Sequence, residues 1–145
     1  MAYKKILIPT DSSELSIEAS KKGIELAKLI GSEVHIIYVI DIVPFIGLPT
    51  EGLWESMKEL LLEEGEDALN TIGDICEKEE VKYVKKILEG SPANEIINYA
   101  EDNEIDLIVL GTTGKTGLDK LLLGSVAEKV SKKAHCSVLL VKKHK

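Results

Sequence analysis

The feature that most constrains the fold of this chain is a series of short apolar runs that alternate with helix-like segments. Five runs suit buried β-strands; they cover residues 4–9, 34–40, 82–88, 106–110 and 137–141. The segments between them repeat apolar residues mostly every three or four positions, as helices do. Strands that alternate with helices form parallel crossover units. The pattern predicts an α/β fold, a single doubly wound five-stranded parallel sheet of order 3-2-1-4-5 with helices on both faces.

Polar residues and glycines indicate where the first helices begin and end. Asp11 or Ser12 is the predicted N-cap of the first helix, and Gly31 is its predicted end. A long helix is expected over residues 54–79, weakened locally by Gly65 and Gly73. Residues 41–53, with two prolines and two glycines, are predicted to form a mobile loop over the strand ends.

Later in the chain, serine marks two further helix starts. Ser91 followed by Pro92 predicts an N-cap and a first helical residue. Residues 118–123 are apolar and helix-prone, and residues 125–128 (SVAE) have the form of a capping box. No repeat or linker divides the sequence, so residues 1–145 are expected to form one domain.

Length and charge argue against several classes of protein. The 145 residues carry a net charge of −7, which disfavours binding to nucleic acids or to membrane surfaces. No apolar run approaches the roughly 20 residues of a membrane span, and the first residues lack a signal-peptide core, so a cytoplasmic protein is expected. Cys76 and Cys136 lack the spacing of a zinc site or a redox pair.

A glycine-rich stretch, residues 111–117 (GTTGKTG), ends like a P-loop directly after the fourth apolar run. A P-loop needs four residues between its glycines, so that backbone amides can surround a phosphate. Counting back from Gly114 places Val109, inside the predicted strand, where the first glycine should be. The stretch is therefore not a Walker A motif.

The predicted topology still brings this stretch to a binding position. In doubly wound sheets, ligands bind beyond the carboxyl ends of the strands where the strand order reverses, here between strands one and four. The residues that follow these two strands are small and polar, residues 9–13 (PTDSS) and 111–114 (GTTG). Asp11 could bind ribose hydroxyls or a cation, glycines admit phosphates, and the helix starting at Ser125 offers free amides. This composition favours a nucleotide.

Each of these residues also has an ordinary structural explanation. Asp11 can be a helix cap alone, Ser125 an ordinary capping box, and Gly111 and Gly114 a tight turn. Lysines at 115 and 120 are most often solvated surface charges. The three histidines, at 35, 135 and 144, stand apart without partner spacing, which gives histidine-based catalysis little support.

Taken jointly, these residues resemble a known family. Gly111, Gly114, Gly124 and Ser125 give the spacing G-x2-G-x9-G-S, and residues 9–11 (PTD) precede them. With this pattern the whole chain resembles the universal stress protein family, whose fold is of the adenine-nucleotide alpha-hydrolase-like type. Within the family the glycine-serine motif marks the branch that binds ATP. The resemblance thus implies an ATP-binding protein.

The resemblance also implies a role for each matching residue. Asp11 would meet the ribose or hold Mg²⁺ against the phosphates, and the backbone of Val39 would meet the adenine edge. The other implied nucleotide-binding residues border the adenosine (Pro9, Thr10, Leu110), line the triphosphate (Gly111, Thr113, Gly114) or donate from the helix start (Gly124, Ser125, Val126). Ala127 stands where the family often has a hydroxyl residue, so one phosphate hydrogen bond is expected to be missing.

The function expected from this reading is an ATP-dependent sensor or switch in the stress response. Family members commonly dimerise through the last strand, so a homodimer through residues 137–141 is expected, beside an unknown protein partner. The chain contains no arginine to stabilise a transferring phosphoryl group, which favours binding over turnover. Two alternatives stay open: a slow Mg²⁺-dependent ATP hydrolase, and a structural dimer module that binds no nucleotide.

Overall fold

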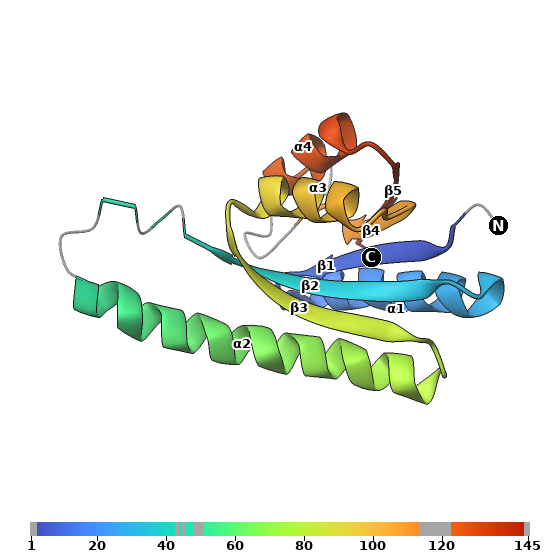
Figure 1. Ribbon diagram of the computed structural model, residues 1–145, viewed down its shortest axis with the longest axis horizontal. Coiled ribbons are helices and arrows are strands. Elements are labelled where there is room, and N and C mark those ends of the chain that lie inside the picture. The colour runs from blue at the N-terminus through green and yellow to red at the C-terminus, as the bar shows by residue number, and fades with distance from the viewer. Residues whose placement is uncertain (1–2, 43, 45, 48–50, 114–122, 144–145) are drawn as a thin grey trace.

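The computed structural model describes residues 3–42, 44, 46–47, 51–113 and 123–143. Its centre is a five-stranded parallel sheet in the order β3-β2-β1-β4-β5, as predicted (Figure 1). The strands are β1 (Lys5–Thr10), β2 (Glu33–Asp41), β3 (Tyr83–Gly90), β4 (Leu107–Gly111) and β5 (Ser137–Val141). The helices are α1 (Glu14–Ile30), α2 (Glu51–Lys78), α3 (Pro92–Asp102) and α4 (Ser125–Lys133).

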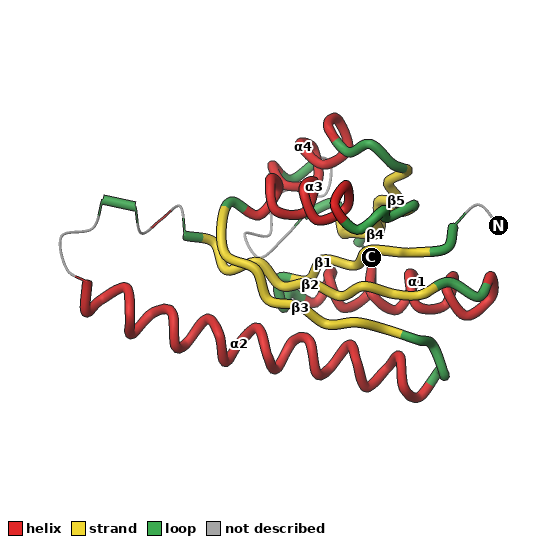
Figure 2. Tube along the Cα trace, viewed as in Figure 1, coloured by secondary structure: helices red, strands yellow, loops and turns green. Residues whose placement is uncertain are grey.

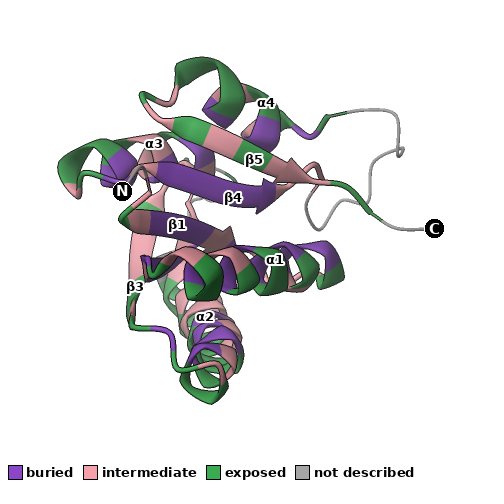
Figure 3. Ribbon diagram, turned by 90° about the vertical axis from the view of Figure 1, so that its right-hand side faces the viewer, coloured by how far each residue is buried: buried purple, intermediate pink, exposed green. Residues whose placement is uncertain are grey.

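The helices cover both faces of the sheet, α1 and α2 on one and α3 and α4 on the other (Figure 2). Successive residues of a strand point to opposite faces, which explains how one short run supplies both cores. In β1, Ile6 and Ile8 pack with the α1/α2 layer, whereas Leu7 packs with the α3/α4 layer, and all three are fully buried. Figure 3 shows β1 and β4 as the buried centre of the molecule.

The turn from β1 into α1 differs from the prediction by one or two residues. The N-cap is Ser13, whose Oγ accepts a hydrogen bond from the Ser16 amide at 3.2 Å. Asp11 instead accepts from the Ser13 amide at 3.0 Å, and Ser12 has a φ of 69°. The predicted caps were wrong because the chain turns at Ser12, in its left-handed conformation, before the helix begins. The predicted end at Gly31 is confirmed, with a φ of 75°.

Helix α2 is continuous from residue 51 to residue 78 and begins three residues earlier than predicted. Its glycines do not interrupt it. At Gly65 the absent side chain lets the helix approach β2, because a Cβ there would lie 2.6 Å from Cδ1 of Tyr38. Figure 1 shows the first turns of α2 extending past the sheet. The loop predicted over residues 41–53 is therefore shorter, since β2 reaches Asp41 and α2 starts at residue 51.

The predicted capping box at the start of α4 was also wrong. The helix does start at Ser125, as predicted, but its N-cap is Gly124. A glycine has no side chain to cap the helix, and Glu128 instead forms an ion pair with Lys132 at 2.8 Å. Of the helix-prone residues 118–123, only Leu123 lies within the described residues, and it precedes α4 without being helical. No helix among the described residues is long and apolar enough to cross a membrane.

Candidate functional site

A cavity of about 470 Å³ opens at the carboxyl ends of β1 and β4, where the strand order reverses. This volume is in the range of small-molecule sites. Ten of the predicted site residues line it: Pro9, Thr10, Asp11, Val39, Leu110, Gly111, Thr113, Gly124, Ser125 and Val126. Gly114 and the lysines at 115 and 120 lie outside the described residues. The two polar segments that are a hundred residues apart in sequence do meet at one cavity.

The β1 side of the cavity is held by short-range hydrogen bonds. The buried hydroxyl of Thr10 lies 3.0 Å from the Ser16 hydroxyl and accepts from the Ser12 amide at 3.2 Å. These bonds and the Asp11 carboxylate fix the turn in which Ser12 takes its left-handed conformation, which costs a non-glycine residue about 1–2 kcal/mol. The turn brings Asp11 to the cavity wall.

The β4 side of the cavity is built from backbone. Gly111 ends β4 against α1, and a Cβ there would lie 2.8 Å from Cγ of Leu15, so only glycine fits without movement. The Gly124 amide donates to the Thr112 carbonyl at 2.7 Å, which fixes the start of α4 to the end of β4. The first amides of a helix have no partner within that helix. Because residues 124–127 line the cavity, this wall offers amides and the positive end of a helix dipole.

Helix α2 supplies a wall that the sequence did not predict. Leu61 lines the cavity, as does Tyr38, whose hydroxyl donates to Oε2 of Glu64 at 2.5 Å. Burial, with the Glu64 carboxylate beside it, raises the pKa of Tyr38 well above its usual range. Pro92 and Ile96 of α3 close the cavity from the other face of the sheet. The periodic apolar pattern that includes Leu61 predicted only that it packs in the core. No local sequence signal identified Leu61, Tyr38, Pro92 or Ile96 as cavity residues.

The candidate metal position rests on one carboxylate. Among the described residues no three His, Cys, Asp or Glu side chains converge as a metal site. Mg²⁺ is commonly held by one or two carboxylates together with substrate phosphates. Asp11 at the cavity wall suits that arrangement, and Mg²⁺ binding there stays a prediction.

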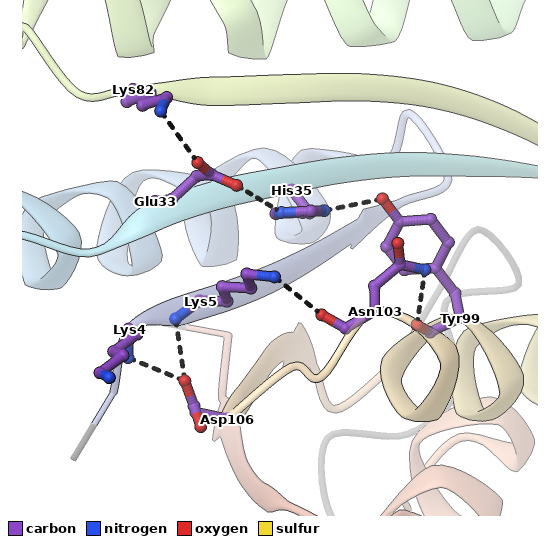
Figure 4. Close-up of polar contacts among 8 residues, drawn as sticks. All are labelled: Lys4, Lys5, Glu33, His35, Lys82, Tyr99, Asn103 and Asp106. Atoms are coloured by element: carbon purple, nitrogen blue, oxygen red, sulfur yellow. Dashed lines mark hydrogen bonds and ion pairs between the residues drawn. The ribbon is translucent and has the colours of Figure 1, made fainter.

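His35 does not stand apart as expected. Its Nδ1 lies 2.7 Å from the Tyr99 hydroxyl and its Nε2 lies 2.8 Å from Oε1 of Glu33, whose other oxygen pairs with Lys82 (Figure 4). The hydrogen bond from His35 lowers the pKa of Glu33. The partner tyrosine is 64 residues away, so spacing could not reveal it. The network ties β2 to α3 near the amino end of β2, away from the cavity residue Val39 at its carboxyl end.

The architecture and the strand-end residues together identify the family. The family model described as the universal stress protein family matches residues 2–142. The chain belongs to the universal stress protein family. The universal stress protein MJ0531 of Methanocaldococcus jannaschii is 57% identical over 143 residues, which cover 99% of this chain and 84% of that protein.

Solved structures of the family share the fold. The structure of MJ0577 from the same organism has a TM-score of 0.88 and 37% sequence identity. The alignment covers 100% of this chain and 99% of the MJ0577 chain. A universal stress protein solved in complex with cAMP has a TM-score of 0.76 and 20% identity, with 99% of this chain and all of that chain covered. The fold is thus the adenine-nucleotide alpha-hydrolase-like fold of this family.

Proposed function

We propose that this universal stress protein binds ATP at the β1/β4 cavity and acts as a cytoplasmic, nucleotide-dependent sensor or switch in the stress response. The observation that carries the proposal is the meeting of Asp11, Gly111 and the start of α4 around one cavity of nucleotide size. The cAMP complex of another protein with this fold supports an adenine nucleotide as the class of ligand.

The walls of the cavity suit the parts of ATP. The adenine ring would lie against the apolar side formed by Val39 and Leu110, with the Val39 backbone at its edge. Asp11 would bind the ribose or hold Mg²⁺ on the phosphates. Gly111 and Thr113 would line the triphosphate, together with Gly114, which lies outside the described residues. The amides of Ser125 and Val126 at the start of α4 would donate to phosphate oxygens. With no arginine in the chain, the site is built for binding rather than for rapid phosphoryl transfer.

The test compares two single substitutions on the same helix. Ser125→Asp places a negative charge at the start of α4, which stabilises the helix but repels phosphate. Ser131→Asp adds the same charge in the second half of α4, at an exposed position that does not line the cavity. Small molecules released from each denatured protein are identified by mass spectrometry, and MgATP binding is measured by calorimetry.

We expect adenine nucleotide to bind to the wild type and to Ser131→Asp, and to be lost from Ser125→Asp. Nucleotide binding that survives in Ser125→Asp would place the ligand elsewhere. No binding to the wild type, with or without added MgATP, would favour the structural module. Metal-dependent ATP turnover that is lost in a folded Asp11→Ala variant would favour the slow hydrolase.

We also propose a homodimer through β5. Within the described residues β5 pairs only with β4, and Leu139 at this sheet edge is 41% exposed. Apolar edge strands are normally covered. Leu139→Lys is expected to give monomers in light scattering, whereas Leu29→Lys, at an exposed leucine of α1, leaves the dimer intact. A wild-type protein that is monomeric at all concentrations tested contradicts the proposal.

A further inference from the structure

The net negative charge of this protein is concentrated on one helix. Helix α2 contains nine aspartates and glutamates and two lysines, so it accounts for the whole net charge of −7. The acidic and basic residues of the remaining chain balance. α2 is also the helix whose first turns extend past the sheet (Figure 1). The strongest charge of the molecule therefore lies on an accessible element.

A groove lies between α2 and the start of α1. The two helices cover the same face of the sheet (Figure 3). Its volume is about 530 Å³. Apolar side chains line part of it, Ile17 from α1 and Leu60 and Ala68 from α2, and Leu60 is 60% exposed. An exposed leucine beside a groove is a surface that a partner can cover.

Carboxylates border this apolar surface. Glu63, Glu64 and Asp67 line the groove, and no lysine among the described residues does. Glu64 accepts a hydrogen bond from the Tyr38 hydroxyl. Neither Glu63 nor Asp67 forms an ion pair within the part of the chain that the structure describes.

A second exposed leucine lies on α2 two turns before Leu60. This residue, Leu53, is 49% exposed. A seven-residue step places Leu53 and Leu60 on the same side of the helix, about 10 Å apart.

We propose that this groove, with Leu53 beside it, docks a lysine-rich amphipathic segment of a partner protein. A lysine can lay its methylene stem on Leu60 and Ile17 while its ammonium reaches Glu63 or Asp67. Apolar residues of the same segment would cover the two leucines. Nucleic acids and anionic membranes are repelled by the charge of α2. A small polycation would leave both leucines exposed, so the apolar surface favours a peptide.

The first experiment uses the wild-type chain and three synthetic peptides in fluorescence anisotropy. One fluorescein-labelled peptide places leucines and lysines at helical spacing, a second replaces lysine by glutamate, and a third replaces leucine by serine. Only the first is expected to bind. Equal binding of the serine peptide would overturn the proposal, because charge alone would then suffice. Binding of the glutamate peptide, or of none of the three, would overturn it as well.

The second experiment locates the binding with matched charge reversals. Glu63→Lys with Asp67→Lys changes the border of the groove, and is expected to weaken binding of the leucine-lysine peptide roughly tenfold. Glu55→Lys with Glu66→Lys makes the same change in net charge at exposed positions of α2 outside the groove. These control substitutions are expected to weaken binding less than about twofold. Equal losses in both proteins would show general attraction to α2 and overturn the site.

The apolar part of the groove has its own control. Leu60→Ser is expected to weaken peptide binding about fivefold, from the apolar area that no longer becomes buried. Leu29→Ser removes a more exposed leucine, from α1 and outside the groove, and should leave binding unchanged. All substituted residues are solvent-exposed, and circular dichroism checks that each variant is folded. Self-association of the wild type that the Glu63/Asp67 reversal abolishes would identify a second copy as the occupant and overturn a separate partner.

Discussion

Two hollows of similar size lie on either side of Thr10, and their chemistry differs. The β1/β4 cavity offers glycines, backbone amides and a helix start beside the Asp11 carboxylate, whereas the α1/α2 groove offers three carboxylates beside apolar side chains, of which Leu60 is exposed. The first suits an anion held by backbone groups, and the second suits a cation held by side chains. The comparison shows that the fold determines the first site, because strand ends and helix starts create it, while surface residues of one helix determine the second.

A common wall separates the two hollows. Thr10 lines both of them, and Tyr38 lines the cavity while its hydroxyl binds Glu64, which lines the groove. On α2 the adjacent residues Leu60 and Leu61 face the groove and the cavity, respectively. The position of α2 against Tyr38 therefore shapes both hollows, and this shared wall would give the proposed nucleotide-dependent switch a physical route to the proposed partner surface. Substitutions in this wall are the most direct test of whether the two hollows are independent.

The largest effect is expected from Gly65→Ala. Its new Cβ would lie 2.6 Å from Cδ1 of Tyr38, so α2 or the ring must move, at a cost of about 1–3 kcal/mol in the free energy of unfolding. Urea denaturation measures this cost. We expect peptide binding at the groove and nucleotide binding at the cavity to change together.

Gly52→Ala is the matched control on the same helix. A Cβ at Gly52 meets nothing within 4 Å, so the change should be neutral or stabilise α2 by up to about 1 kcal/mol. A Gly65→Ala protein as stable as Gly52→Ala would show that the contact with Tyr38 does not position the helix.

A smaller effect is expected from Tyr38→Phe. The substitution keeps the ring but removes the hydroxyl that donates to Glu64, which should lower the free energy of unfolding by about 1–2 kcal/mol. If the wall couples the hollows, MgATP should alter peptide affinity less in Tyr38→Phe than in the wild type. The measurement is a peptide titration at saturating and zero MgATP. Equal MgATP effects in both proteins would separate the two hollows energetically.

The sheet could be predicted because five short apolar runs, rich in β-branched residues, alternate with helical segments, and few folds other than a parallel α/β sheet accommodate this order. Strand order and helix layers are confirmed, and most boundaries agree within one or two residues. The predicted end of α1 at Gly31 and the predicted start of α3 at Ser91 and Pro92 are confirmed, whereas the predicted N-caps of α1 and α4 were wrong. Three consecutive polar residues, Asp11, Ser12 and Ser13, can each cap a helix, and the choice depends on the left-handed backbone of Ser12. At α4 the helix starts at Ser125 as predicted, but the N-cap is Gly124, which the capping-box pattern does not predict.

The strand-end part of the candidate site followed from topology, since parallel strands bring their carboxyl ends to one edge. The contributions of α2 could not be predicted in the same way. Leu61 and the Tyr38–Glu64 hydrogen bond depend on how closely α2 packs, which Gly65 permits only in three dimensions. The glycine was expected to weaken the helix, and its packing role appears only in the folded structure. Long-range pairs such as His35 and Tyr99 are missed for the same reason.

The smallest effect on either hollow is expected from Glu33→Gln. Glu33 lies at the amino end of β2, whereas the cavity lies at the carboxyl end, so this substitution tests a site distant from the cavity. The hydrogen bond from His35 lowers the pKa of Glu33 below its ordinary value of 4.5. A carboxyl with a lowered folded-state pKa stabilises the protein fully above the unfolded value, and this stability is lost as pH falls through the folded value.

Urea midpoints of the wild type should therefore fall as pH decreases below about 4.5, and Glu33→Gln should reduce that dependence. At neutral pH the variant should be less stable, while its nucleotide and peptide affinities stay within about twofold of the wild type, because neither hollow includes Glu33. Glu80→Gln, at an exposed carboxyl, controls for the loss of one charge. A change in either affinity would show that the Glu33–His35–Tyr99 network reaches the cavity through α3, whose N-terminal half contributes Pro92 and Ile96 to the cavity wall.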